Sequence, residues 1–80
     1  MIRIPVVSTD VLSLGFSGTT LEVHFKRNDA IYQYHGVPET LYQLLLDATA
    51  DGQSVGGFLA REVKKQGYKY ERVPNEQKTI

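Results

Sequence analysis

The chain has 80 residues, of which 41% are hydrophobic and 22% charged, and it contains no cysteine. This length and composition are those of one globular domain rather than of a disordered or collagen-like chain. The lack of cysteine excludes disulfides and thiolate metal sites as sources of stability. No apolar run reaches the roughly 18 residues that span a membrane, so we expect a cytoplasmic protein.

The basic and acidic residues, nine of each, cancel in number but are unevenly placed. Zero net charge argues against a protein that coats nucleic acid by bulk attraction. Residues 1–60 carry three basic and six acidic side chains, whereas residues 61–72 carry five basic and two acidic ones. We therefore expect any anion-binding surface to involve residues 61–72.

Alternation of apolar and polar residues, the period of a half-buried strand, occurs three times in the first half of the chain. The predicted strands cover residues 11–16, 21–26 and 31–35. In the first of them, Leu12, Leu14 and Phe16 share the apolar side. The second has the clearest alternation, with apolar residues at positions 21, 23 and 25.

A two-residue hairpin turn at 28–29 is expected to join the second and third strands. It would pair Phe25 with Tyr32 and Val23 with Tyr34. Both tyrosines then lie on the apolar face of a three-stranded antiparallel meander.

The first helix is predicted to begin at Pro38, which suits a first helical turn because its missing N–H would have no partner there. Its stripe toward the sheet follows helical spacing and consists of Leu41, Leu44, Leu45 and Ala48. Tyr42 and Leu46 lie nearer the flank of this stripe, and we expect both to stay partly exposed.

The second helix is predicted to begin after Ser54, a favourable N-cap residue, and to end near 66–67. Its apolar stripe consists of Val55, Phe58, Leu59 and Val63. Residues 68–73 are expected to return as a short edge strand or as an extended segment, and the polar residues 74–80 as a disordered tail. The predicted fold is therefore α+β, a three-stranded antiparallel meander followed by two helices packed on one face, with a short C-terminal strand.

Several short motifs, taken in this order, resemble those of the KTSC domain family over residues 7–73. They are Ser8-Thr9, Leu21-Glu22-Val23-His24-Phe25, Tyr32-Gln33-Tyr34, Gly36-Val37-Pro38 and Ser54-Val55-Gly56-Gly57-Phe58-Leu59. Two features depart from the family pattern: the loop at 49–53 is longer than usual, and Ala60 stands where the family commonly has Asn. The resemblance implies a single KTSC-like domain over residues 1–73.

This family is found as small stand-alone bacterial and phage proteins and at the C-terminus of some lysyl-tRNA synthetases. The synthetase context implies RNA binding, and the resemblance does not suggest catalysis. A phage setting would place the protein in the host cytoplasm, where it could sequester a nucleotide signal of host immunity.

The residues themselves also argue against an enzyme. His24 and His35 are expected as diagonal neighbours on the solvent face of the sheet, with Glu22 opposite His35. We interpret them as part of a polar surface and predict no metal, since no metal-ligand motif supports a site. Ser54 is interpreted as a helix cap rather than as a nucleophile, and no cofactor motif is present.

Two features favour a binding site instead. Ser54, Gly56 and Gly57 begin the second helix, where free N–H groups could hold a phosphate, although tight packing of this helix on the sheet is the more common reason for such glycines. The basic residues that follow are interleaved with tyrosines, an arrangement that suits stacked bases but also an ordinary solvated surface. The candidate ligand-binding residues are Ser54, Gly56, Gly57, Arg61, Lys64, Lys65, Tyr32, Tyr34, Tyr68, Tyr70 and Arg72.

Three hypotheses follow from these candidates. The first is a non-catalytic pocket for a small phosphorylated, nucleotide-type ligand, completed at a homo-oligomer interface that buries Ile31, Tyr42 or Leu46. The second is an accessory domain that binds single-stranded RNA. The third is a protein–protein adaptor that presents apolar residues of the first helix.

Overall fold

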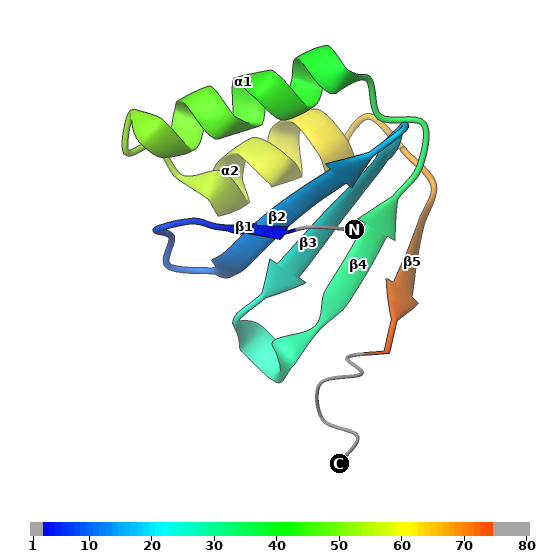
Figure 1. The fold of residues 1–80 in the computed structure, drawn as a ribbon, viewed down its shortest axis with the longest axis horizontal. Coiled ribbons are helices and arrows are strands. Elements are labelled where there is room, and N and C mark those ends of the chain that lie inside the picture. The colour runs from blue at the N-terminus through cyan, green and yellow to red at the C-terminus, as the bar shows by residue number, and fades with distance from the viewer. Residues whose placement is uncertain (1–2, 75–80) are drawn as a thin grey trace.

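The fold is a five-stranded antiparallel sheet with two helices on one face, in a computed structural model that describes residues 3–74 (Figure 1). The strands lie in chain order and are β1 (Arg3–Pro5), β2 (Val11–Ser17), β3 (Thr20–Phe25), β4 (Ile31–Tyr34) and β5 (Tyr70–Val73). The helical segments are the 3-10 turn η1 (Arg27–Asp29), α1 (Glu39–Ala50), α2 (Val55–Leu59) and the π-helical turn η2 (Ala60–Lys64). The α+β prediction is confirmed, and so is the short C-terminal strand.

The sheet is longer than predicted because β1 adds a strand that sequence alternation did not indicate. β1 has only three residues and includes Pro5, which is tolerated there because β1 is an edge strand. No helix within residues 3–74 has the length and apolarity needed to cross a membrane. The predicted tail lies, apart from Pro74, outside the described residues, and the single-domain boundary at 73 stays a prediction.

The predicted register between β3 and β4 is wrong by two residues. Val23 pairs with Tyr32, and Leu21 pairs with Tyr34. The cause is a connection longer than a two-residue turn, in which η1 contains Asn28 at a φ of 59°. Because a shift of two residues keeps every side chain on its face, both tyrosines still lie on the helix side of the sheet.

The first residues of β2 also differ from prediction. The pairing with β3 shifts between Val11 and Ser13, which marks a β-bulge. Val11 is consequently buried, and Leu12 is exposed instead of facing the core. Beyond the bulge the predicted alternation holds, with Leu14 in the core and Phe16 packed against it.

Helix α1 is rotated relative to the predicted stripe. Tyr42 is buried and stacks on Phe16, with ring centroids 4.9 Å apart, whereas Leu44 is 57% exposed. The large ring of Tyr42 covers more of the sheet than Leu44 could, so it occupies the inward position. Leu45 and Ala48 are buried as predicted.

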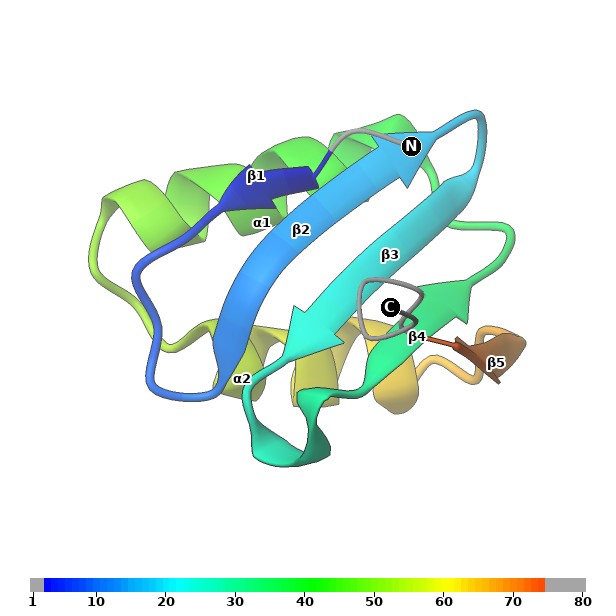
Figure 2. The same ribbon diagram turned by 60° about the horizontal axis from the view of Figure 1, so that its bottom comes forward.

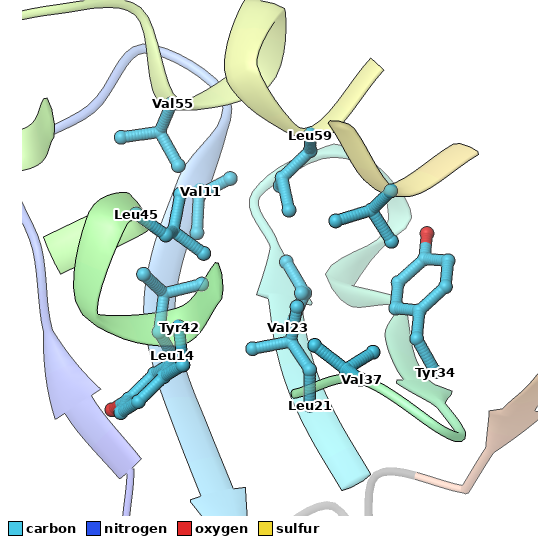
Figure 3. Packing of buried hydrophobic residues seen from close by; sticks show 11 residues of the cluster. Val11, Leu14, Leu21, Val23, Tyr34, Val37, Tyr42, Leu45, Val55 and Leu59 are labelled. Atoms are coloured by element: carbon cyan, nitrogen blue, oxygen red, sulfur yellow. The ribbon is translucent and has the colours of Figure 1, made fainter. Parts of the chain in front are cut away.

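The core lies between the sheet and the two helices. Figure 3 shows Val55 and Leu59 pointing from α2 toward the sheet and Tyr34 pointing from β4 toward the helical layer. In Figure 2 the helices lie behind the sheet, α1 behind β1 and β2 and α2 behind β3 and β4, while β5 lies at the margin with no helix behind it. The sheet therefore extends beyond its helical cover at β5 (Figure 2).

Candidate ligand groove

Three tyrosines lie on the helix side of β4 and β5, from the core to the uncovered edge of the sheet. Tyr34 of β4 pairs directly with Tyr70 of β5, and Tyr32 lies two residues away on the same face. Their ring centroids are 5.7 Å apart for Tyr34 and Tyr70, 5.9 Å for Tyr32 and Tyr70, and 6.5 Å for Tyr32 and Tyr34. We call Tyr32, Tyr34 and Tyr70 the tyrosine platform.

Two pockets lie side by side between this platform and the helical segment that carries α2 and η2. The turn pocket has a volume of about 400 Å³ and is lined by Asp10, Phe25, Arg27, Asn28, Ala30, Tyr32, Gly56, Leu59 and Lys64. The tyrosine pocket has a volume of about 460 Å³ and is lined by Tyr32, Tyr34, Lys64, Gly67, Tyr68 and Tyr70. The two pockets share Tyr32 and Lys64, and we call them together the groove.

Lys64 brings positive charge to the junction of the two pockets. Its Nζ lies 5.4 Å from the centre of the Phe25 ring, within cation–π range. Lys64 is the last residue of η2, where the N–H of Lys65 donates to the carbonyl of Ala60 at 3.2 Å. Such π turns are frequent at functional sites.

The π turn also explains why Val63 remains in the core. Residues four apart on a regular α-helix advance by about 40° around the axis, so Val55, Leu59 and Val63 would drift steadily away from the sheet. A wider turn reverses part of this drift. All three side chains are buried, and Lys64, the next residue, is left at the edge that faces the groove.

Tyr34 belongs both to the core and to the tyrosine pocket. Burial, followed by repulsion from ionised Tyr32 and Tyr70, raises the pKa of Tyr34 from 10.0 to about 12. Its hydroxyl therefore stays protonated and able to donate a hydrogen bond at any physiological pH. Burial also raises the pKa of Tyr42.

The start of α2 is packed closely against β2. A Cβ on Gly56 would lie 2.7 Å from Oδ2 of Asp10, so a glycine there leaves room for this carboxylate in the turn pocket. The Gly57 N–H donates to Oγ of Ser54 at 3.1 Å, which confirms Ser54 as the cap. These contacts agree with the packing interpretation of the glycines, and the helix-start anion site stays a prediction.

The structure brings together about half of the predicted site residues. Those that line the groove are Tyr32, Tyr34, Gly56, Lys64, Tyr68 and Tyr70. Arg72 pairs with Tyr32 and so lies on the same face of the sheet. Ser54 lines a separate hollow, with Thr9 and Gln53 among its neighbours.

The remaining predicted residues lie outside the groove. Arg61 and Lys65 are exposed and line neither pocket, and Gly57 lies against Ser54 and Arg61. Sequence reasoning missed Asp10, Phe25, Arg27, Asn28 and Leu59 as lining residues. The charged and amide side chains next to the expected turn were the available signal, but the connection was expected to be a two-residue turn, whereas it contains the longer segment η1.

The polar face of the sheet differs from the predicted histidine cluster. Glu22 lies opposite Gln33, which donates to it at 2.9 Å, and His24 lies opposite Ile31. His24 contacts Asp29 instead, with 2.5 Å between Nε2 and Oδ1, whereas His35 contacts Glu71 at 3.2 Å. Across residues 3–74 no three His, Cys, Asp or Glu side chains gather as metal ligands would.

Ile31 and Tyr42 were expected to be left for an oligomer interface, but both are already buried within one chain. Leu46 is half-buried. Within residues 3–74 the exposed large apolar side chains are Ile4, Val7, Leu12, Leu44 and Tyr70. Of these, only Tyr70 lines the groove.

Comparison with protein families agrees with the motifs. The model of the KTSC domain matches residues 8–68, which is more than half of the chain. Comparison with curated proteins finds no match. The chain therefore belongs to the KTSC domain family.

Proposed function

We propose that this protein is a non-catalytic binding module that holds a small phosphorylated, nucleotide-type ligand in the groove. The observation that carries the proposal is the position of Lys64, which places a cation beside the tyrosine platform and at the junction of the two pockets.

The aromatic part of the groove supports binding of a base. Base–aromatic stacking contributes about 1–3 kcal/mol per base and requires only accessible ring surface. Tyr70 is 64% exposed, and Tyr32 and Tyr68 are half-buried. The platform therefore offers ring surface that the core does not use.

The charged part supports binding of phosphate. Lys64 lines both pockets, Arg27 lines the turn pocket, and Arg72 lies beside Tyr32 on β5. A local group of cations on a chain of zero net charge suits a compact anion better than a long polyanion.

The residues that line the groove favour ligand binding over catalysis. Among the described residues that line it, Asp10 is the one carboxylate, and none is a histidine. General acid–base catalysis commonly relies on a pair of such groups with separated pKa values. A single acid next to tyrosines and cations suits recognition.

We further propose that a second copy of the chain covers the groove at β5. An open surface groove buries a ligand only in part, whereas pockets for small ligands commonly bury most of the ligand surface. Tyr70, on the edge strand, is the exposed apolar residue that such a copy would cover.

Calorimetric titration with GMP, AMP, UMP and inorganic phosphate tests the proposed function. We expect wild-type protein to bind at least one nucleotide more tightly than phosphate alone. Lys64→Gln should weaken this binding about 10- to 100-fold, since a hydrogen bond to a charged group contributes roughly 1.5–3 kcal/mol.

Lys65→Gln is the matched control, because Lys65 is the next residue, is also exposed and lines neither pocket. Its affinity for the nucleotide should stay within about twofold of wild type, as expected of a surface charge that makes no contact with the ligand. Equal losses in the two variants, or no binding of any nucleotide by wild type, would refute the proposal.

A further inference from the structure

We infer that the groove takes two neighbouring bases of one ligand, with the phosphate that joins them at Lys64. This inference rests on the proposed function and goes beyond it by naming the ligand class, a dinucleotide unit.

Tyr32 divides the groove into two parts. The Tyr32 ring meets Phe25 on one side, with centroids 5.8 Å apart and ring planes at 77°, and Tyr70 on the other, at 5.9 Å and 64°. Phe25 lines the turn pocket and Tyr70 lines the tyrosine pocket. Each pocket therefore has its own aromatic wall, and Tyr32 is common to both.

The volumes of the two pockets also favour two bases. Both pockets exceed the roughly 300 Å³ at which small-molecule sites begin. A mononucleotide would fill one pocket and leave the ring surface of the other exposed to water. Two linked bases would use both.

The position of Lys64, which lines both pockets, matches the position of a joining phosphate. In a dinucleotide the joining phosphate lies between the two bases, and Lys64 lies between the two pockets. A terminal phosphate would need its cation at the far end of one pocket. A shared ammonium group instead matches a phosphodiester that connects two stacked bases.

The two pockets also differ in chemistry. The turn pocket contains the carboxylate of Asp10 and the amide of Asn28, which can hydrogen-bond to the edge of a base. Guanine presents adjacent N–H donors that a carboxylate can accept, so we expect guanine there. The tyrosine pocket offers mainly ring surface and stacks any base.

The test compares GMP with the linear dinucleotide GpG by calorimetric titration of the full chain. We expect one GpG per chain and an affinity at least about tenfold higher than that for GMP, because a second base is stacked. Equal affinities of GMP and GpG would overturn this inference while leaving the proposed function intact. No binding of GMP or GpG would also overturn this inference, and it would overturn the proposed function only if AMP and UMP failed to bind as well.

A change in the tyrosine pocket locates the second base. Tyr70→Ala removes a ring that is largely exposed, and it should bring the ratio of GpG to GMP affinity close to one. Tyr70→Phe keeps the ring and should keep the ratio near its wild-type value. A ratio that Tyr70→Ala leaves unchanged would argue against the second base site.

Two further ligands distinguish the sources of a dinucleotide unit. If a six-residue guanine-containing single strand binds more than tenfold more tightly than GpG, the unit is part of single-stranded RNA. If the cyclic form of GpG binds as tightly as this strand or more tightly, the ligand is a free dinucleotide. Either outcome supports two base sites joined at Lys64 when GpG also binds more tightly than GMP, and equal affinities of GMP and GpG overturn the inference in both cases.

Discussion

Tyr34 is the residue at which the core and the groove meet. It is only 3% exposed, yet it lines the tyrosine pocket, so the same side chain contributes to stability and to the proposed site. The platform rings beside it cause part of the rise in its pKa. Its ionisation should therefore affect folding.

The stability of the protein should fall as the pH rises from about 10 to 12. In this range the unfolded chain loses the Tyr34 proton at its ordinary pKa of 10.0, whereas the native state keeps the proton until about 12. The unfolded state then binds fewer protons than the native state, so the free energy of unfolding decreases with pH. The stabilisation that is lost in this range is fully present below pH 10, where Tyr34 is protonated in both states.

Tyr34→Phe removes that titration, and its free energy of unfolding should fall less steeply than that of wild type above pH 10. Urea unfolding at pH 8, 10 and 11 measures the two slopes, and the pH 8 values provide the reference at which both states remain protonated. Parallel slopes for the two proteins would contradict a raised pKa at this position.

The face of the sheet on which Tyr32 and Tyr34 lie was predictable from sequence, whereas their partners on the neighbouring strand β3 were not. Alternation fixes which side of a strand a residue occupies, and a register error of two residues leaves that side unchanged. The error arose at Asn28 and Asp29, which both have positive φ in a connection that the sequence made appear shorter. The same connection carries Arg27 into the turn pocket, so one misjudged turn accounts for several missed site residues.

At the scale of the helices, α1 shows how weakly an apolar pattern fixes rotation. Leucine or tyrosine occupies five of the positions from 41 to 46, so several stripes satisfy helical spacing and the shape of the sheet selects one. The stacking of Tyr42 on Phe16 is a contact between distant parts of the chain, and no local pattern indicates it. The second helix has fewer apolar residues, and its stripe was predicted correctly.

Leu44 of α1 tests this rotation, and Leu59 of α2 provides the reference for a fully buried leucine. Leu59→Ala should lower the free energy of unfolding by about 2–5 kcal/mol, because a fully buried leucine leaves a cavity. Leu44→Ala should change it by less than about 0.5 kcal/mol, as is usual for an exposed position. Chemical denaturation followed by circular dichroism measures both values.

The Leu44 result also tests whether another molecule covers α1. A loss comparable to that of Leu59→Ala, growing with protein concentration, would mean that Leu44 is buried between chains. The outward position of Leu44 on α1 would then place this side chain in an interface between two chains. If Leu44→Ala lowers the free energy of unfolding as much as Leu59→Ala does, and by the same amount at every protein concentration, then Leu44 faces the core of its own chain. Helix α1 would then have the rotation that the sequence predicted.

For the whole molecule, we expect a homo-oligomer at tens of micromolar. A small chain without disulfides gains stability from association, and a second copy would cover Tyr70 and the groove. Light scattering should give a mass above 9.0 kDa that rises with concentration. A constant mass of 9.0 kDa would leave the groove as an open surface and remove the interfacial part of the proposal.

Extension of the sheet from β5 to β5 is an unfavourable way to form this oligomer. A twofold axis between two antiparallel edge strands places one residue opposite its own copy. Near the middle of β5 that residue is Glu71 or Arg72, so like charges would meet. We therefore expect the second copy to pack on the ring of Tyr70 rather than to continue the sheet.

The position of β5 in the chain has a consequence for the order of folding and for ligand release. Strands β1 to β4 pair with neighbours close in sequence, whereas both helices lie between β4 and β5 along the chain. Because closing a longer loop costs more entropy, we expect β5 to pair late in folding, after Tyr32 and Tyr34 have joined the sheet. Edge strands also open locally at a lower free energy than the core. We therefore expect fraying of β5 to open the tyrosine pocket while the core stays folded, which would let the proposed ligand leave without global unfolding.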